Sequence, residues 1–342
     1  MTTATCLPLV RDEVWLPVEE TAQVGRIRRT VTTLAERLGF GANRTAEVGL
    51  AVTEIGTNLH KHARQGVVLV RTVRGERDAA VEVVALDRGP GIADVELAWQ
   101  DGQSTTGTLG VGLGAVARLA TSCSMTSRAG SGTALVARFA AARDWVPEWG
   151  AEHAAGVTRP IGGEEVCGDA YAICRSTDRL TLVMCDGSGH GPLAAAASDR
   201  AVRMFRDLAP MPPEQLLARL HHELRGTRGG ALAVAEIDLA ARSVRFCGLG
   251  NIAGAVLSDG RKQGMISVPG VAGHQARTIR AFDYELPEGA VVVLHSDGLT
   301  ERWGADFGAD PATDDPVLVA ATLLREAGVR NDDASVLVAR TT

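Results

Sequence analysis

The chain has 342 residues, of which 45% are hydrophobic and 22% charged, and its formal net charge is −6. This length is more than one hydrophobic core usually organises, so two domains are expected, and the composition is that of an ordinary soluble globular chain. A negative net charge argues against nucleic acid or an anionic membrane as the main partner.

The N-terminus and the cysteines indicate a cytoplasmic protein. The opening "MTTATCLPLVRDEVW" has no long apolar run behind a basic segment, which predicts no signal peptide, and no stretch is apolar for long enough to span a bilayer. Six cysteines stand at positions 6, 123, 167, 174, 185 and 247 without a CxxC pair. This spacing favours reduced thiols over a disulfide framework or a zinc ribbon.

The first half is expected to contain two helices, two strands, a glycine-rich loop, a helix and a strand, in that order. Apolar residues at helical spacing predict helices over about residues 24–38 and 44–63, separated by a glycine-containing break. The strands are expected in "GVVLVRTVRG", "AAVEVVALDRG" and "GTALVARFA". The periodicity fades after residue 141, so we expect a domain over 1–142, a linker over 143–156 and a second domain over 157–342.

The second half is rich in short β-type runs, with two helical stretches near residues 191–208 and 213–225. The expected strands are Ala170–Ile173, Leu180–Cys185, Ala231–Asp238, Val244–Cys247, Ala253–Leu257, Ala290–His295 and Ala334–Ala339. Two antiparallel sheets with helices are the architecture that this pattern favours.

The second helix carries a polar stripe in "TEIGTNLHKHA". Glu54, Asn58 and His62 are spaced i, i+4, i+8 and therefore lie on one face of the helix. The carboxylate could serve as a general base and the amide as a magnesium ligand. A solvated helix edge is the alternative for these three residues taken alone.

Two glycine-bearing motifs follow this helix. In "ALDRGPGI" a strand ends at Asp87, which can accept a hydrogen bond from an exocyclic amine, while Gly89 and Gly91 let the backbone approach a flat base. "DGQSTTGTLGVGLGAVARLA" then runs into a helix, where free backbone N–H groups suit a polyphosphate. The candidate phosphate-binding glycines in it are Gly107, Gly110, Gly112 and Gly114.

As an ordered set, the Glu-x3-Asn-x3-His stripe, "DRGPGI", the glycine-rich lid and "SGTALVARF" resemble the GHKL (Bergerat) ATP-binding α/β sandwich over about residues 15–140. The lid "WQDGQSTTGTLGVGLGAVARL" is similar to that of the RsbT branch of serine/threonine anti-sigma kinases. The resemblance implies ATP and Mg²⁺ as ligands. It implies Asn58 as magnesium ligand, Glu54 as general base for a protein hydroxyl, Asp87 on adenine, Gly89, Gly91 and Thr133 around the base, and the lid glycines on the phosphates.

Four sites in the second half place an aspartate at a strand terminus. They are Asp169 in "VCGDAYAI", Asp186 in "LVMCDGSGHGPLAAAAS", Asp297 in "LHSDGLTERW", and the pair Asp332 and Asp333 in "RNDDASVLVAR". Any one of them alone is more simply a turn-forming aspartate. Four such sites in one β-rich half favour a metal centre, and hard oxygen ligands suit magnesium or manganese rather than zinc.

The order "GD-x-Y … DGSGHG … SDGLTE … DDAS" resembles the SpoIIE-like branch of the metal-dependent (PPM-type) serine/threonine protein phosphatases, over about residues 157–341. This implies an α-β-β-α sandwich of two antiparallel sheets and two Mn²⁺ or Mg²⁺ ions. The implied ligands are Asp169, the Ala170 carbonyl, Asp186, Asp297 and Asp332, with Asp333 the weaker candidate. "CGD" in place of "GGD", and "GLGNIAGAVL" where many members have "GH" before proline, look closer to RsbX and leave the substrate open.

Together the two resemblances imply a bifunctional serine/threonine kinase and phosphoserine/phosphothreonine phosphatase in a partner-switching pathway. The implied partners are STAS-domain anti-sigma antagonists or stressosome-type proteins, with a downstream switch phosphatase or sigma factor as a further candidate. One alternative is a phosphatase with an ATP-binding regulatory domain. The other is a binding protein of the anti-sigma type.

Overall fold

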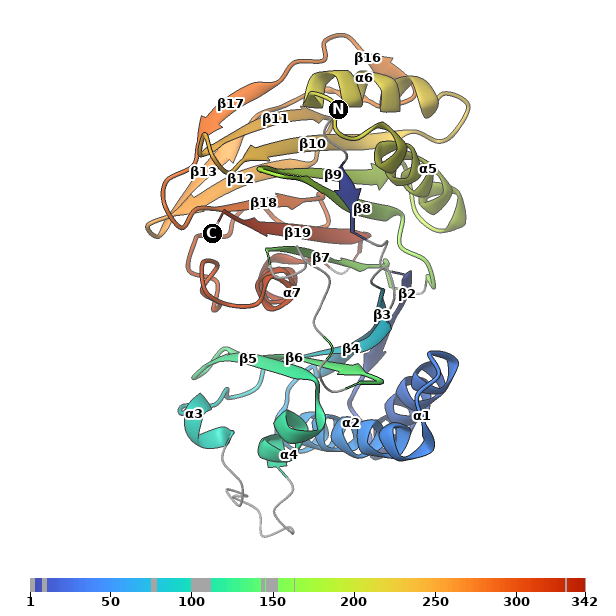
Figure 1. Cartoon of the computed structure of the whole chain (residues 1–342), viewed down its shortest axis with the longest axis vertical. Helices are drawn as coiled ribbons and strands as arrows, with labels where there is room; N and C mark the ends of the chain where they lie inside the picture. Colours follow the sequence, from blue (N-terminus) through green and yellow to red (C-terminus); the bar gives the residue numbers. More distant parts are fainter. Residues whose placement is uncertain are drawn as a thin grey trace. The chain divides into compact units, whose positions relative to one another are not determined.

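A computed structural model describes residues 4–7, 11–74, 79–99, 112–142, 145, 153–162, 164–329 and 331–341. The chain divides into two units (Figure 1). The N-terminal unit is Pro8–Glu148, and the C-terminal unit combines Met1–Leu7 with Trp149–Thr342. The chain therefore begins in the C-terminal unit, passes through the N-terminal unit and returns.

A five-stranded antiparallel sheet forms the frame of the N-terminal unit. Its strand order is β2 (Arg11–Pro17), β3 (Val67–Arg74), β4 (Ala79–Leu86), β6 (Gly132–Ala140), β5 (Ser122–Arg128). The helices are α1 (Thr21–Arg37), α2 (Ala42–His62), the short α3 (Val95–Ala98) and α4 (Gly112–Leu119). This order confirms the predicted α/β sandwich, with its two long helices close to where the periodicity placed them.

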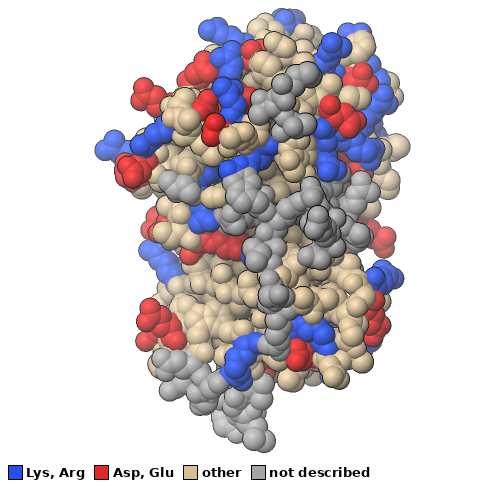
Figure 2. All heavy atoms as spheres, viewed as in Figure 1, with Lys and Arg blue, Asp and Glu red and all other residues tan. Residues whose placement is uncertain are grey.

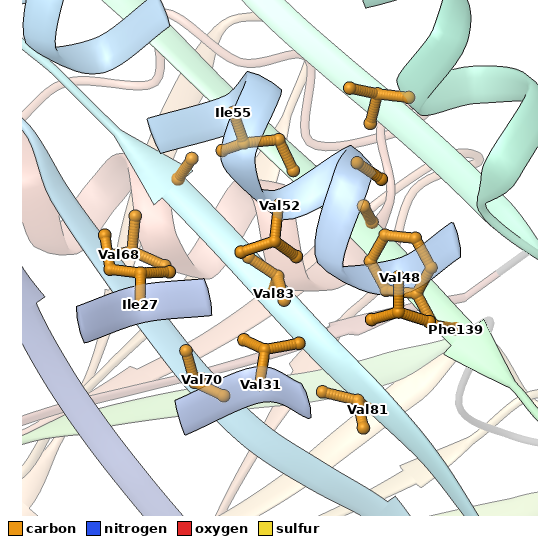
Figure 3. Close-up of a cluster of buried hydrophobic side chains, with 14 of the residues drawn as sticks. Ile27, Val31, Val48, Val52, Ile55, Val68, Val70, Val81, Val83 and Phe139 are labelled. Carbon is orange, nitrogen blue, oxygen red and sulfur yellow. The ribbon is translucent and has the colours of Figure 1, made fainter. Parts of the chain in front are cut away.

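The core of this unit lies between α1, α2 and one face of the sheet (Figure 3). Both helices present apolar residues at spacings of three and four, and alternate residues of the strands meet them. The labelled side chains are Ile27 and Val31 from α1, Val48, Val52 and Ile55 from α2, and Val68, Val70, Val81, Val83 and Phe139 from the sheet. Burying each such side chain contributes about 1.5–3 kcal/mol to folding, so this packing holds α2 and its polar stripe in place.

Three charged residues are also buried in the sheet of the N-terminal unit. Glu82 on β4 accepts hydrogen bonds from Nε of Arg71 on β3 and from Nε of Arg138 on β6, each at 2.6 Å. Glu82 is only 1% exposed. The carboxylate thus links β3, β4 and β6 at positions that are paired directly across the sheet.

We expect Glu82→Gln to destabilise the N-terminal unit by about 3 kcal/mol, because it removes the buried negative charge to which both Arg71 and Arg138 donate hydrogen bonds. Equilibrium urea unfolding followed by circular dichroism measures this loss. Glu36→Gln, an exposed change on α1, is the matched control and should stay within about 0.5 kcal/mol of wild type. A Glu82→Gln protein as stable as the control would contradict the expectation.

The C-terminal unit has two packed sheets with helices outside them. The first sheet has the order β1 (Thr5–Cys6), β8 (Asp169–Ser176), β9 (Arg179–Gly187), β10 (Gly230–Asp238), β11 (Ser243–Leu249), β14 (Ser267–Val268), with β17 (Phe282–Glu285) also on β11. The second has the order β13 (Arg261–Met265), β12 (Ala253–Ser258), β18 (Val291–His295), β19 (Ala334–Arg340), β7 (Ala154–Arg159). A small pair joins β15 (Gly270–Val271) and β16 (Gln275–Ala276).

The helices α5 (Pro192–Leu208) and α6 (Pro213–Glu223) pack on the first sheet, and α7 (Pro316–Ala327) packs on the second. Apolar side chains from both sheets, such as Met184, Phe246 and Leu294, fill the space between them. This is the expected α-β-β-α sandwich of two antiparallel sheets, and it places the ends of strands from both sheets near one another.

Several elements were not predicted, among them α7, β2, β5 and β7. α7 was missed because ten of its twelve residues are buried, so it shows no polar face and its apolar run has no helical signature. β2 was missed because "RDEVWLP" begins with three charged residues, and β5 because "SCSMTSR" is mostly polar. Neighbouring strands rather than an alternating apolar pattern hold both. The first residues of β7 lie inside the stretch assigned to the linker.

The N-terminal segment differs most from expectation, since residues 1–142 were assigned to one domain. Cys6 on β1 lies opposite Cys174 on β8, and a disulfide joins them. The expectation of reduced thiols is therefore wrong for this pair. The two cysteines are 168 residues apart, and only the strand register reveals that they meet.

The surface carries charges of both signs. On the face drawn in Figure 2, basic and acidic side chains are interspersed over the residues that the figure colours. Among the described residues, no helix combines the length and apolar character needed to cross a membrane.

Candidate functional site

Strand register brings the predicted aspartates of the C-terminal unit together. Asp169, the first residue of β8, is paired with Asp186 near the end of β9. Asp297 follows β18, and Asp332 precedes β19, which is the neighbour of β18. The charges of Asp169, Asp297 and Asp332 all act on Asp186, so the four carboxylates form one cluster, hereafter the aspartate cluster.

Burial and mutual repulsion make this cluster costly in its charged form. Asp169 is 5% exposed, and neither of its carboxylate oxygens has a hydrogen-bond partner among the described residues. Burial raises the pKa of Asp169 to about 7, although the nearby hydroxyls of Ser296 and Ser335 oppose the rise. Burial, with the charges of Asp169 and Asp297, raises the pKa of Asp186 to about 9.

These properties fit a divalent metal ion. Unpartnered buried carboxylate oxygens lack the positive charge that a cation would supply, and hard oxygen donors suit magnesium or manganese. Within the described ranges, no group of three or more His, Cys, Asp or Glu side chains is arranged to hold an ion as it stands. The Ala170 carbonyl belongs to the residue after Asp169 on β8.

Asp333 has a different environment from its neighbour Asp332. Its Oδ1 accepts a hydrogen bond from the backbone N–H of Ile161 at 2.8 Å, and its Oδ2 accepts one from Gly168 at 2.9 Å. It is 3% exposed. Asp333 thus fixes the segment that leads into Asp169, whereas Asp332 is partly exposed and has a pKa raised by burial and by the charge of Asp297.

Asn251 is a site residue that the sequence analysis missed. Its Nδ2 donates to Oδ2 of Asp297 at 2.5 Å. It lies in "GLGNIAGAVL", the stretch noted as a departure from the family pattern, and that departure was the available signal. An amide there orients Asp297 without adding charge.

Trp303, His295 and Lys262 hold the two sides of the loop that carries Asp297 together. Nε1–H of Trp303 donates to Nε2 of His295 at 3.2 Å, and Nδ1 of His295 is 2.9 Å from the Ser296 carbonyl oxygen. Nζ of Lys262 lies 3.6 Å from the centre of the Trp303 ring and donates to the Glu301 carbonyl at 3.1 Å. Burial lowers the pKa of His295, which keeps the imidazole neutral and able to accept from tryptophan.

We expect Trp303→Phe to weaken Mn²⁺ binding about fivefold, because a buried His295 nitrogen loses its donor at a cost of about 1–3 kcal/mol and the loop loosens. Isothermal titration with Mn²⁺ measures this affinity. Trp99→Phe, in the N-terminal unit, is the control and should bind Mn²⁺ like wild type. Equal affinities in the two variants would show that the Trp303–His295 bond does not position Asp297.

The predicted adenine-side residues of the N-terminal unit also meet. The backbone N–H of Asp87 donates to the Thr133 carbonyl at 3.0 Å, and its Oδ1 accepts from the Gly89 N–H at 2.6 Å. A methyl group on Gly89 would lie 2.8 Å from the carbonyl oxygen of His62. Glycine is therefore required where this turn packs on the end of α2.

A hydroxyl pair completes this turn. The hydroxyl of Ser127 lies 2.9 Å from that of Thr133 and accepts from the Ile92 N–H at 2.8 Å. Gly91 has φ +70°, and a methyl group there would lie 2.2 Å from the Arg128 carbonyl oxygen. Ser127 was not predicted, because it lies on the polar strand β5.

Glu54 and Asn58 lie one turn apart on α2, partly buried, and neither side chain bonds another described residue. Gly112 and Gly114 begin α4, which packs against α2. Gly107 and Gly110 lie outside the described residues. The structure thus brings the turn with Asp87 and Gly89 against the end of α2, next to Thr133. Asn58 and Glu54 stand one and two turns before that end.

Two family models match the chain, one in each half. The family model "Histidine kinase-like ATPase domain" matches residues 17–157, and "Stage II sporulation protein E (SpoIIE)" matches residues 176–342. The fold and the sites therefore define a histidine kinase-like ATPase domain joined to a SpoIIE domain.

The N-terminal part has a relative at higher identity. Serine/threonine-protein kinase RsbT of Bacillus subtilis (strain 168) is 36% identical over 110 residues, which cover 32% of this chain and 83% of RsbT. The chain belongs to the family of RsbT, with a SpoIIE domain added in its second half.

Two solved structures are similar to the chain. One comes from work on the bacterial stressosome as "a modular system that has been adapted to control secondary messenger signaling"; it is 29% identical, with a TM-score of 0.51, over 55% of this chain and 98% of that one. The other, RsbX in complex with magnesium, is 20% identical with a TM-score of 0.48, over 55% of this chain and 96% of that one.

Proposed function

We propose that the chain is a bifunctional enzyme that sets the phosphorylation state of a protein serine or threonine. The N-terminal unit transfers phosphate from ATP, and the C-terminal unit removes it. One observation carries this proposal: a chain with an RsbT relative at 36% identity in one unit holds four mutually repelling aspartates at strand ends in the other. Joining opposed activities raises the effective concentration of each near a shared partner.

In the kinase reaction, the residues on α2 and in the turn beside its end have separate roles. Asp87 accepts a hydrogen bond from the adenine amino group, with Thr133 and Gly91 shaping the pocket. Asn58 would hold Mg²⁺ on the phosphates, and Glu54, one turn away, would take the proton from the attacking protein hydroxyl. The lid glycines contribute backbone N–H groups to the phosphates.

In the phosphatase reaction the aspartate cluster holds two Mn²⁺ or Mg²⁺ ions, which supply positive charge to polarise water and neutralise the phosphate. Asp169 and Asp186 contribute buried oxygens from the first sheet, together with the Ala170 carbonyl. Asp297 and Asp332 contribute from the second sheet. Asn251 orients Asp297.

The partners proposed are STAS-domain anti-sigma antagonists or stressosome-type proteins, with a downstream switch phosphatase or sigma factor as a further contact. The RsbT relative and the similar structure from the stressosome study support this choice. The chain would act in the cytoplasm, with neither nucleic acid nor membrane as its target.

The test measures phosphate release from a phosphoserine STAS protein with Mn²⁺, and incorporation of phosphate from ATP into the unphosphorylated protein. Both activities in the wild-type chain support the proposal. Release without incorporation, with ATP still bound, would reduce the N-terminal unit to an ATP-binding regulator. Neither activity, with a stoichiometric sigma factor copurifying, would make the chain an anti-sigma-type binding protein.

A further inference from the structure

Arg228 lies next to the loop that follows Asp186, and no carboxylate of the described residues forms an ion pair with it. β10 begins at Gly230, which is paired with Gly187, and its next residue is paired with Asp186. The backbone N–H of Ser188 donates to the Gly229 carbonyl at 2.9 Å. Arg228 therefore stands one residue beyond this contact, at the sheet edge where β8 begins and β9 ends.

The backbone around Arg228 is fixed from several sides. Oγ1 of Thr227 donates to the Leu224 carbonyl at 2.6 Å and accepts from the Gly229 N–H at 3.0 Å. The Arg228 carbonyl oxygen lies 3.0 Å from Nε2 of His274. Gly229 has φ +68°, a conformation that glycine adopts readily. These bonds fix the backbone at Arg228 and do not involve its guanidinium group.

The guanidinium of Arg228 reaches over the loop that follows Asp186. A methyl group on Gly189 would lie 3.0 Å from its Nη1. Among the described residues no carboxylate pairs with it, and the side chain is exposed. In the same loop, Nδ1 of His190 already contacts Oε1 of Glu164 at 2.9 Å. Among the described residues the guanidinium of Arg228, by contrast, is not engaged by a carboxylate.

Two large apolar side chains are exposed on the segments next to this loop. Val166 is 45% exposed and Leu193 is 61% exposed. The segments that carry them touch, since a methyl group on Gly168 would lie 3.0 Å from Cβ of Ala194. Apolar side chains and an unpaired arginine thus lie on adjoining segments of the C-terminal unit.

We propose that Arg228 binds the phosphate of a phosphorylated serine or threonine, and that Val166 and Leu193 contact an aliphatic residue in the same segment of the partner. The proposal rests on the phosphatase function proposed above. Guanidinium groups match phosphate oxygens in geometry and in charge. The aliphatic contacts make the surface selective for a protein segment over a small phosphate ester.

The direct test is the affinity of a fluorescein-labelled phosphoserine peptide, with leucine on each side of the phosphoserine. Fluorescence anisotropy is measured with the full-length Asp186→Asn protein in Mg²⁺, so that turnover does not interfere. Adding Arg228→Gln is expected to weaken binding about tenfold or more, whereas the unphosphorylated peptide shows no change. Adding Leu193→Ser is expected to weaken binding of both peptides several-fold.

Arg261→Gln, on the edge strand β13, is the matched control, because it removes the same charge from another exposed position. Equal affinities for the phosphopeptide in the Arg228→Gln and Arg261→Gln proteins would overturn the proposal. In the otherwise wild-type protein, Arg228→Gln should raise KM for p-nitrophenyl phosphate and for the peptide, while Leu193→Ser raises only that for the peptide. If the proposed phosphatase function is wrong, the wild type itself will not hydrolyse either substrate. The binding assay needs no hydrolysis, so it tests the role of Arg228 independently of that function.

Discussion

Asp186→Asn is expected to reduce Mn²⁺-dependent phosphate release from a phosphoserine protein on the order of a thousandfold. The amide keeps the shape of the side chain and loses the negative charge that holds a cation. Phosphate release is measured over a Mn²⁺ titration. Asp207→Asn, an exposed change on α5, is the matched control. If the variant regains the full rate at high Mn²⁺, Asp186 contributes only to the affinity for Mn²⁺ and not to the catalysed step.

The same substitution is expected to stabilise the metal-free protein. Burial and like charges raise the pKa of Asp186 to about 9, so its ionised form is disfavoured in the folded state. Near neutral pH the unfolded chain ionises Asp186 whereas the folded protein must protonate it, so replacing this carboxyl by an amide should increase the free energy of unfolding by about 1–3 kcal/mol. Thermal unfolding in EDTA measures the change. Added Mg²⁺ should raise the Tm of the wild type and have little effect on the variant.

This stabilisation depends on pH in a defined direction. Because the pKa of Asp186 is raised in the folded state, the metal-free wild type is most stable below the unfolded-state pKa of about 4. Its free energy of unfolding then decreases as the pH rises towards the folded-state pKa of about 9. The Tm of metal-free wild type should therefore fall relative to Asp186→Asn between pH 5 and 9. A constant difference across that window would contradict the repulsion described for the aspartate cluster.

Glu54→Gln is expected to lower phosphate transfer from ATP to the partner protein by about a hundredfold to a thousandfold, the usual contribution of a general base. ATP affinity should be unchanged, because Glu54 lies one turn from Asn58 and away from the turn at Asp87. Radiolabel incorporation and a fluorescent ATP analogue measure the two quantities.

Glu36→Gln removes a carboxylate from α1 and is the matched control, expected to transfer phosphate like wild type. Asp87→Asn should give the opposite pattern to Glu54→Gln, with nucleotide affinity lost first. Full transfer by the Glu54→Gln protein would leave the N-terminal unit without its proposed base. That result would favour the interpretation of the N-terminal unit as an ATP-responsive regulator.

The candidate metal ligands could be predicted because each aspartate stands at a strand end beside glycine or another carboxylate. Strand ends within one sandwich converge, so local sequence was enough to find Asp169, Asp186, Asp297 and Asp332. Asn251 and the Trp303–His295 bond could not be predicted in this way. Their contacts depend on which loops meet, and that is decided by packing between residues far apart in the chain.

The same distinction explains which elements were predicted. α1 and α2 each bury one face, so their periodicity is visible in the sequence. α7 is buried almost all round, and β5 is a polar strand held by β6. Neither carries a pattern of its own, because the surrounding structure determines its conformation.

The place of β1 has a consequence for how the chain folds during synthesis. Thr5 and Cys6 leave the ribosome about 170 residues before their partners Arg175 and Cys174. At a synthesis rate of roughly 5–20 residues per second, that interval lasts about 8–34 seconds. The five strands of the N-terminal unit's sheet are all synthesised between β1 and β8, so β1 stays without its partner strand while that sheet can already form.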